Sequence, residues 1–481
     1  MNYEPVIGLE IHAQLLTDSK IFCGCSTRFG APPNTHVCPV CLGLPGALPV
    51  LNHRAVELAI RAAHALDCTV HPSSVFARKN YFYPDLPKGY QISQYDQPLA
   101  TAGVVEYQAE KATRRVRILR LHLEEDAGKS LHEGFSDSDR STYLDYNRSG
   151  VPLVEIVTQP DLRSAAQAGE FFGRLRAILV AIGVNDGNME EGSLRCDANV
   201  SVRPEGASDF GTKTEVKNLN SFRHVQRALE YEIERQTGLV GRGERVTQET
   251  RLWDVAAGRT VSMRSKEEAH DYRYFPEPDL PALQIDPVWI AEIRAALPEL
   301  PEARRRRLIA QYGLPEYDAA LLTQSSVLAA YFELAAEAAG NPKAASNWIM
   351  GELSRKMNEA GIDVDRVPLS PYALGGLIRL IDSGTISGPI AKTVFEHMWA
   401  SGRPADEIVA DEGLAVIGDE ASVEAAVREV LAAHAQAVAQ YRAGKQQTFG
   451  FLVGQVMKAT KGKANPVLVN TLMRRILDSA S

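Results

Sequence analysis

Several familiar signatures are missing from this sequence of 481 residues. No uninterrupted apolar run approaches the roughly 18 residues that a membrane-spanning helix needs. Met1 to Lys20 lack a basic start followed by an apolar core, so a secretion signal is not expected. The glycine-lysine phosphate loop of many nucleotide-binding proteins and the Rossmann glycine fingerprint are also missing. We therefore expect a cytoplasmic protein that holds any nucleotide by other means.

Cysteine is scarce and clustered. The chain has six cysteines, and four of them form Cys23-Gly-Cys25 and, after twelve intervening residues, Cys38-Pro-Val-Cys41. In a reducing compartment such clustering indicates metal more than disulfides. Four thiolates would complete a tetrahedron around Zn²⁺ and leave no open position, which predicts a structural site. Four reduced thiols without metal are the alternative, and an iron-sulfur cluster is less favoured.

Acidic and basic residues are unevenly distributed. The formal net charge of -8 argues against a nucleic-acid partner until the charges are placed along the chain. Ala405 to Gln440 contain eight acids and one base, whereas Tyr441 to Arg475 contain seven bases and no acid. This basic tail predicts contacts with RNA phosphates, and an ordinary basic helical surface is the alternative. The candidate residues are Lys445, Lys458, Lys461, Lys463, Arg474 and Arg475.

The pattern of apolar residues divides the chain. Up to about residue 290, stretches of period two predict antiparallel strands, with helices at Arg163–Ile182 and at Ser221–Gln236, the latter capped by Gly238. The clearest strands are Val6–Leu15, Arg114–Leu123 and Leu194–Arg203.

Beyond a proline-rich stretch, helical periodicity takes over. We expect helices at Ser326–Ala339 and Ala344–Glu359, then a break near Ser401–Pro404. Three helices follow, at Val423–Arg442, at Thr448–Thr460 and from Asn465 onward. These breaks predict domains at 1–293, 294–402 and 403–481.

Polar residues alternate with apolar ones on several predicted strands. Glu10 and His12 stand two apart, so both point to one face of a strand while Ile11 faces the other. A carboxylate and an imidazole on one face could hold a metal ion, and a half-exposed strand with polar residues outward is the alternative. The same alternation recurs in His122, Glu124 and Asp126, with Glu125 on the opposite face, in Arg195, Asp197, Asn199, Ser201 and Arg203, and in Glu215 and Lys217.

Together these strands predict one polar surface that handles anions through divalent cations. Phosphoryl transfer uses such a surface. Mg²⁺ neutralises phosphate oxygens and the carboxylate of the substrate can attack, so no protein nucleophile is required. The isolated Cys68 and Cys196 are accordingly more typical of core residues than of nucleophiles.

These motifs resemble one family along the length of the chain, the GatB subunits of aspartyl/glutamyl-tRNA amidotransferases. The most specific stretch is Leu144-Asp-Tyr-Asn-Arg-Ser-Gly-Val-Pro-Leu-Val-Glu-Ile-Val-Thr158. Further matching stretches are Gly8–Leu15, Arg78–Asp85, Tyr90–Gln94, Leu123–Gly128, Glu190–Arg195 and, in the tail, Lys461–Pro466.

The resemblance implies a fold and a reaction. The fold would be α+β: a mainly antiparallel, cradle-like catalytic domain with a zinc loop, then an all-α domain and a small all-α tail that binds tRNA. ATP would phosphorylate the side-chain carboxylate of Asp-tRNA(Asn) or Glu-tRNA(Gln), and ammonia would displace the phosphate. The ammonia would come through a channel from the GatA amidase subunit, with the small GatC subunit joining the two.

The resemblance also implies site residues, position by position. Glu10, His12, Glu124, Glu125 and Glu191 would serve Mg²⁺ and the phosphates. The choice between Glu124 and Glu125 stays open, because strand alternation favours the first and the turn after Asp126 the second. Neighbours in the ATP pocket would be Lys79, Ser193, Arg195, Glu215 and Lys217, and Lys79 with Lys88 could also border the ammonia channel. The zinc ligands would be Cys23, Cys25, Cys38 and Cys41.

Two other functions fit parts of this pattern. A tRNA-binding scaffold without catalysis would use the acidic strands only as a partner surface. A zinc-dependent hydrolase would need an open metal position, which four cysteines do not leave.

Overall fold

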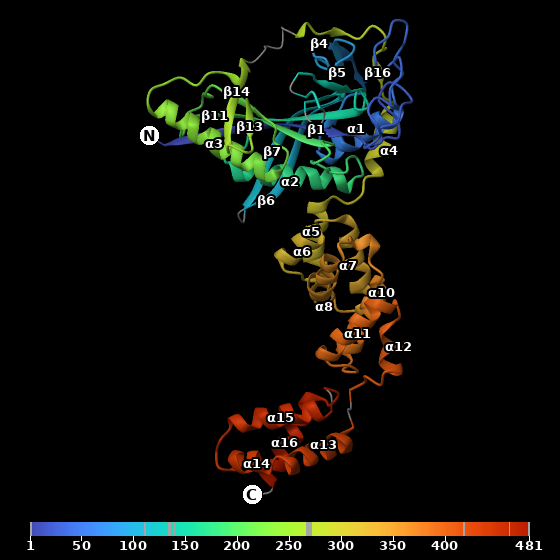
Figure 1. Ribbon diagram of the computed structural model, residues 1–481, viewed down its shortest axis with the longest axis vertical. Coiled ribbons are helices and arrows are strands. Elements are labelled where there is room, and N and C mark those ends of the chain that lie inside the picture. The colour runs from blue at the N-terminus through green and yellow to red at the C-terminus, as the bar shows by residue number, and fades with distance from the viewer. Residues whose placement is uncertain are drawn as a thin grey trace. The chain divides into compact units, whose positions relative to one another are not determined.

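The chain folds into two compact units, Met1–Pro301 and Glu302–Ser481. A computed structural model describes residues 2–109, 112–132, 136–138, 140–265, 272–416, 419–460 and 462–479. In Figure 1 the first unit runs from blue to yellow and the second from yellow to red. The first contains the large sheet and the second is helical.

A twelve-stranded mixed sheet dominates the first unit. Its described strand pairs are antiparallel except β12 with β13, which agrees with the predicted mainly antiparallel arrangement. The strand order is β14 (Arg259–Ser265), β13 (Glu249–Asp254), β12 (Thr214–Lys217), β11 (Leu194–Pro204), β1 (Tyr3–Gln14), β10 (Pro152–Thr158), β7 (Ala112–Glu125), β5 (Tyr90–Gln94), β4 (Phe76–Asn80) and β15 (Phe275–Pro276). Strand β6 (Ala100–Ala109) pairs with β7 and with β2 (Thr69–Val70). Two short pairs lie outside this sheet, β3 (Ser73–Ser74) with β16 (Leu283–Gln284) and β8 (Lys129–Leu131) with β9 (Tyr143–Asp145).

One face of the sheet is apolar. On β1, Ile7, Leu9 and Ile11 are at most 1% exposed and join a core that includes residues of the helices α1 (His53–Ala65), α2 (Ala165–Ala181) and α3 (Phe222–Gly241). Figure 1 shows α2 and α3 side by side along the sheet. Because strand side chains alternate, the opposite face is left for the polar residues.

The predicted helices of this unit are present. Ser164 caps α2 by accepting a hydrogen bond from the Gln167 N–H, and Ser221 caps α3 in the same way. Helix α3 continues to Gly241, so the predicted cap at Gly238 is wrong. The unit also contains α4 (Pro287–Ala295), whose N-terminus is capped by Asp286.

The second unit begins with a bundle around its own core. The predicted helix at Ser326–Ala339 is confirmed as α7, which ends at Gly340 in the left-handed region (φ 70°). The predicted helix at Ala344–Glu359 contains one π-helical turn, at Ile349–Leu353. The bundle comprises α5 (Pro301–Tyr312), α6 (Glu316–Leu322), α7, α8 (Pro342–Trp348), α9 (Ser354–Ala360), α10 (Pro371–Asp382), α11 (Gly388–Ser401) and α12 (Ala405–Asp411).

The last helices pack around a third core, which includes Val427, Leu452 and Leu472. They are α13 (Glu420–Ala433), α14 (Ala435–Arg442), α15 (Gln447–Ala459) and α16 (Pro466–Ser479). The predicted helix at Val423–Arg442 is interrupted at His434, where the backbone leaves helical geometry (ψ 44°). The domain boundary at 402/403 stays a prediction.

Within the described part of the chain, no single helix has the length and apolarity to cross a membrane. Helices α6 and α7 qualify only as a pair, and they are bent by 119°.

Candidate functional site

The candidate site lies on the polar face of the sheet, where strand register aligns its residues. His12 of β1 stands opposite Glu155 of β10 on one side and Arg195 of β11 on the other. Glu155 in turn stands opposite His122 of β7. Residues directly opposite each other in neighbouring strands lie about 5 Å apart at Cβ and share a face. The register therefore brings residues far apart in the sequence into one row.

Two imidazoles and three carboxylates meet around this row. His12 Nε2 lies 3.4 Å from an oxygen of Glu10, 3.4 Å from one of Glu155 and 3.8 Å from one of Glu124. His122 Nε2 lies 3.7 Å from Glu124 and 3.6 Å from Glu155. We call these five residues the acid–imidazole cluster.

Electrostatics within the cluster oppose the effects of burial. Burial, reinforced by Glu155, raises the pKa of Glu10. Burial alone would lower the pKa of His12, but the hydrogen bond and charge of Glu155 raise it to about 9. Burial would raise the pKa of Glu155, yet His122 and His12 hold it well below its usual range. The acids thus attract positive charge strongly, either protons on imidazole or a metal ion.

The donor set fits divalent cations. Ligand atoms of Glu10, His12 and Asp197 lie within 4.8 Å of one another, as do those of His12, Glu124 and Glu155. Carboxylate oxygens are the ligands that Mg²⁺ prefers, and an imidazole nitrogen adds a borderline donor. His12 belongs to both groups, so the arrangement can hold a divalent ion at the centre of the cluster.

Three cationic side chains surround the cluster. Lys79 is half-buried, and nearby Tyr274, Glu124 and Glu155 raise its pKa against the effect of desolvation. Lys217 Nζ lies 2.8 Å from Asp197 Oδ2.

Arg195 Nη2 lies 2.8 Å from Asp126 Oδ2, and the Arg195 Nε is buried without a hydrogen-bond partner. Burial would raise the pKa of Asp126, but Arg148 and Arg195 lower it. These cations remain charged beside the acids and can face anionic oxygens of a ligand.

A pocket of about 430 Å³ opens onto the cluster. Its floor is the polar face of the sheet, and the segment after β12 contributes Asn218, whose φ of 69° lies in the left-handed region. The lining includes Glu10, His12, Lys79, Glu124, Arg195 and Lys217, all predicted as site residues, together with Tyr81, Asp126 and Asp197.

The structure does not bring every predicted residue into this pocket. Glu125 points to the opposite face of β7, where Lys88 pairs with its carboxylate and the Ile92 N–H donates to it at 2.9 Å. Lys88 and Glu125 line a second cavity, of about 310 Å³, beside the cysteine loop. Of the two glutamates that the sequence left open, the geometry therefore joins Glu124 to the cluster.

Three other predicted residues are not part of the pocket lining. Glu191 is exposed in a turn, and its backbone N–H donates to Asn188. The Ser193 hydroxyl donates to the Asn188 carbonyl oxygen at 2.8 Å. Glu215 is buried next to Lys217 and accepts a hydrogen bond from Thr250.

Sequence reasoning missed Glu155 and did not select His122, Asp126 or Asp197 as site residues. Glu155 is 5% exposed in β10, where all the other side chains are apolar except Thr158. A lone acid inside an apolar strand was the available signal, because an unpaired buried carboxylate is costly. The remaining three were visible as members of polar strand faces.

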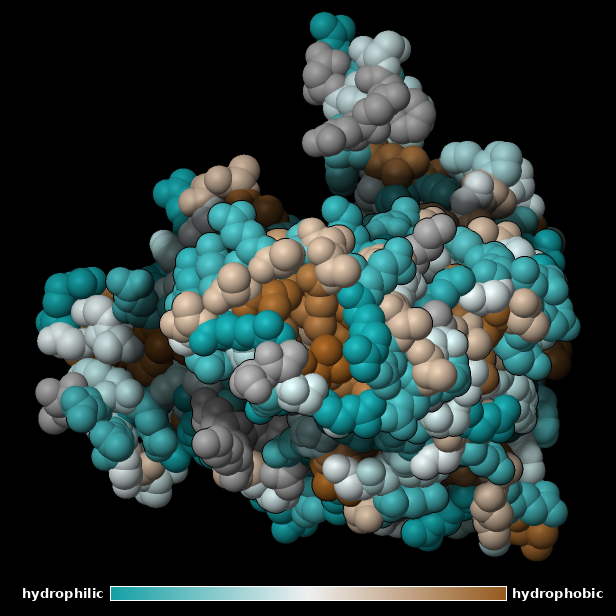
Figure 2. Space-filling model, turned by 90° about the horizontal axis from the view of Figure 1, so that it is seen from below, coloured by the Kyte–Doolittle hydropathy of each residue, from teal (hydrophilic) through white to brown (hydrophobic). Residues whose placement is uncertain are grey.

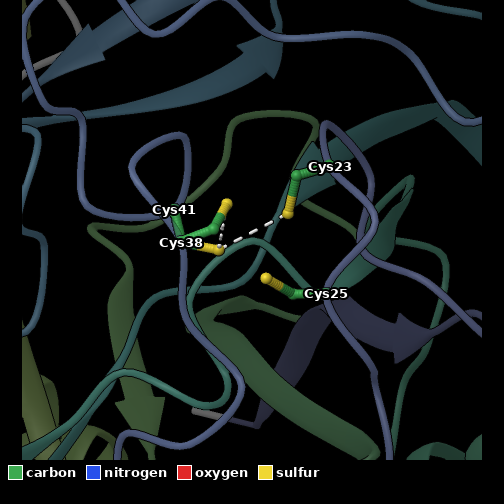
Figure 3. Close-up of side chains that lie close together, drawn as sticks. All are labelled: Cys23, Cys25, Cys38 and Cys41. Atoms are coloured by element: carbon green, nitrogen blue, oxygen red, sulfur yellow. Dashed lines mark hydrogen bonds between the residues drawn. The ribbon is translucent and has the colours of Figure 1, made fainter.

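The four clustered cysteines converge, as Figure 3 shows. Their sulfur atoms lie within 4.8 Å of one another, with Cys23 Sγ 3.4 Å and Cys38 Sγ 3.6 Å from Cys41 Sγ. Tetrahedral zinc with bonds of about 2.3 Å would separate the sulfurs by about 3.8 Å. The hydrogen bond with Cys23, aided by the charge of Lys20, lowers the pKa of Cys41 to about 4. The donor set fits a metal such as zinc.

The basic residues of the tail differ in their surroundings. Lys445 and Lys458 are exposed, Arg474 stacks on Phe449 at 5.2 Å, and Arg475 pairs with two acids of α13. Lys463 donates to the Gly413 carbonyl oxygen, and Lys461 lies outside the described residues. Apolar side chains are also exposed on this module, and Figure 2 shows hydrophobic residues among hydrophilic ones on one face of the molecule.

The first unit thus carries an acidic pocket flanked by cations on a large mixed sheet, and such a pocket is typical of enzymes that bind phosphate groups through a divalent ion. Comparison with known families sharpens this class. Residues 5–291 match the GatB/GatE catalytic domain, and residues 330–477 match the GatB domain.

Similar proteins have been named in several bacteria. The chain is 56% identical over 477 residues to the B subunit of the aspartyl/glutamyl-tRNA(Asn/Gln) amidotransferase of Thermodesulfovibrio yellowstonii, with 99% of this chain and 100% of the relative covered. It is 53% identical over 479 residues to the protein of the same name from Chlorobaculum tepidum, with all of both chains covered. The chain belongs to the GatB family.

The sulfur geometry predicts the metal content. The full-length chain is expected to bind one zinc ion, and Cys38→Ser should abolish binding because three thiolates hold zinc less tightly than four. Atomic absorption on purified protein measures this. The control is Cys68→Ser: Cys68 lies outside the cluster, and burial raises the pKa of its thiol to about 12. An unchanged zinc content in Cys38→Ser would contradict the assignment.

Proposed function

We propose that this chain activates the side-chain carboxylate of Asp-tRNA(Asn) or Glu-tRNA(Gln) with ATP and then converts it to the amide. As the GatB component of an amidotransferase, the chain acts within a multi-subunit enzyme. The observation that carries the proposal is the pocket in which the acid–imidazole cluster meets Lys79, Arg195 and Lys217. Such a site can hold a phosphate chain and a carboxylate together.

The cluster and the cations would divide the work. Two groups of possible ligands share His12, namely Glu10, His12 and Asp197, and His12, Glu124 and Glu155. Either would hold Mg²⁺, which when bound neutralises phosphate oxygens. Lys79, Arg195 and Lys217 would orient the anionic groups so that the substrate carboxylate lies in line with the phosphate it attacks.

The chemistry needs no nucleophile from the chain. The carboxylate oxygen of the substrate forms a bond to the γ-phosphorus of ATP while the bond from that phosphorus to the bridging oxygen breaks and ADP leaves. Ammonia then attacks the acyl carbon, loses a proton and expels phosphate, which leaves the amide. Cys196 lines the pocket, but burial raises the pKa of its thiol well above the usual value, which disfavours a thiolate there.

Other subunits would supply the ammonia. No Gly/Ser-rich amidase motif occurs in the sequence. We therefore assign glutamine hydrolysis to a GatA subunit, joined through GatC, in the cytoplasm. Lys88 and Glu125 line the cavity behind β7, while Lys79 and Glu124 line the substrate pocket in front of it. This arrangement supports a route by which ammonia reaches the substrate pocket past Lys88 and Lys79.

Zinc would be structural. Four cysteines would hold the ion at every tetrahedral position and leave none for water, so a zinc-dependent hydrolase is not favoured. A scaffold without catalysis is not favoured either, since the match to the GatB/GatE catalytic domain covers the pocket.

Glutamate substitutions test the metal assignment. In the complex, Glu124→Gln should raise the Mg²⁺ concentration needed for amide formation about 10- to 100-fold, because the cluster loses one charged ligand. Glu125→Gln is the matched control: with free ammonia supplied, its Mg²⁺ dependence should remain that of the wild type. The opposite pattern, with only Glu125→Gln changing the Mg²⁺ dependence, would show that Glu125 is the ligand.

Tail substitutions test tRNA contact. Lys445→Ala and Lys458→Ala should each weaken tRNA binding by the complex and reduce its salt slope by about one, because each removes one phosphate contact. Arg428→Ala serves as a control, since Arg428 is exposed but pairs with Glu424 on the acidic side of the module. Unaltered salt dependence in both lysine variants would leave the tail as an ordinary basic surface.

Substrate choice tests the proposed reaction itself. The reconstituted complex, given ATP and ammonium, is expected to amidate both Asp-tRNA(Asn) and Glu-tRNA(Gln), because one methylene changes binding by only about 1–3 kcal/mol. Amino acids released from the tRNA are separated and counted. Amide formation without ATP, or no amide from either substrate, would refute the proposal.

A further inference from the structure

Lys20 is a lysine buried at the start of the cysteine loop. It is 1% exposed, and its ammonium group makes three contacts. Nζ lies 2.7 Å from the His36 carbonyl oxygen, 3.2 Å from that of Tyr146 and 3.5 Å from Cys41 Sγ. An ammonium group has three N–H donors, so these contacts can use all of them.

A buried ammonium needs a negative charge nearby, because burying an isolated charge is costly. Within the described parts of the chain, no carboxylate oxygen forms an ion pair with Lys20 Nζ within 4.0 Å. Glu125, which lines the same cavity, is already paired with Lys88. Among the described residues, the one side-chain partner of the Lys20 ammonium is the sulfur of Cys41, and this sulfur balances the charge as a thiolate.

The cysteine cluster would carry an excess of negative charge, which complements the positive charge of Lys20. Zn²⁺ with four thiolates carries a net charge of -2, and a partly buried site of that charge is stabilised by a cation next to a sulfur. The burial of Lys20 and the convergence of the four sulfurs are separate observations. A negatively charged metal site would explain why a lysine is buried here, and the lysine would compensate the charge of that site.

We propose that Lys20 is the counter-ion of the four-cysteine zinc site and couples that site to the segment before β10. The proposal rests on the zinc site assigned above. Through Tyr146 the ammonium holds this segment, and the Ile21 N–H donates to the Gly150 carbonyl oxygen at 2.9 Å. In the same segment Arg148 Nε lies 3.7 Å from Asp126, which lines the substrate pocket. Lys20 is thus a positioning residue, connected by contacts to both sites.

Zinc release from the full-length chain tests this role. Lys20→Met should release zinc to a chromogenic chelator about 10- to 100-fold faster than the wild type, as expected for loss of an outer-sphere partner. Lys20→Arg keeps the charge and should recover most of the retention. Lys129→Met, the same change at an exposed lysine of the same unit, should behave as the wild type.

A spectroscopic readout separates charge from folding. With Co²⁺ in place of zinc, the sulfur-to-cobalt charge-transfer band should move to lower energy in Lys20→Met, because a thiolate without its cation gives up an electron more easily. Lys20→Gln, which keeps an N–H donor without the charge, provides the same comparison if the methionine variant does not fold.

The outcomes distinguish the two proposals. A wild-type chain without zinc would overturn the zinc site itself. A wild-type chain with one zinc, and neutral Lys20 variants with unchanged release rate and cobalt spectrum, would overturn the role of Lys20 alone.

Discussion

The hydrogen-bonded register of β1 between β10 and β11 is the constraint on which the site depends. Eleven residue pairs fix β1 against β11, and this register places His12 between Glu155 and Arg195. A shift of one residue would turn the imidazole into the core and Ile11 into the pocket. The apolar residues that alternate with the site residues oppose that shift, so the core enforces the geometry of the pocket.

Charge balance is the second condition. A group of acids this close together would repel itself in a buried site, and folding would be penalised unless cations or protons compensate. Lys217 and Arg195 each pair with a neighbouring acid, and His12 carries its proton more tightly than a free imidazole does. A metal ion that entered the pocket would therefore exchange with compensating charges that are already present.

Much of this arrangement follows from the sequence, and the rest fails for identifiable reasons. Period two placed Glu10 and His12 on one face, because alternation is a local property of a strand. The order of strands in a sheet depends on contacts between distant parts of the chain. The pairing of His12 with Glu155 could therefore not be predicted from the sequence pattern. Glu155 itself occupies a strand whose composition indicated core.

The errors in the helices have similarly physical causes. Gly238 lies inside α3 although glycine usually ends helices, because tertiary packing overrides a propensity cost of about 1 kcal/mol. The interruption of the helix at His434 could not be predicted, because no glycine or proline stands at that position. The assignment of Glu124 rather than Glu125 to the cluster required the end of β7 to be located, and strand ends are the least determined by pattern.

Glu124 and Glu125 are neighbours in the chain, yet they line different cavities on the two sides of β7. The two cavities are thus separated by the thickness of one strand, and each is lined by one of two consecutive glutamates. A single substitution in β7 changes the side chain that lines one cavity and leaves the other cavity unchanged. A one-residue insertion or deletion within β7, however, would turn the side chains beyond it from one cavity to the other. The length of this strand should therefore be far less free to vary than its composition.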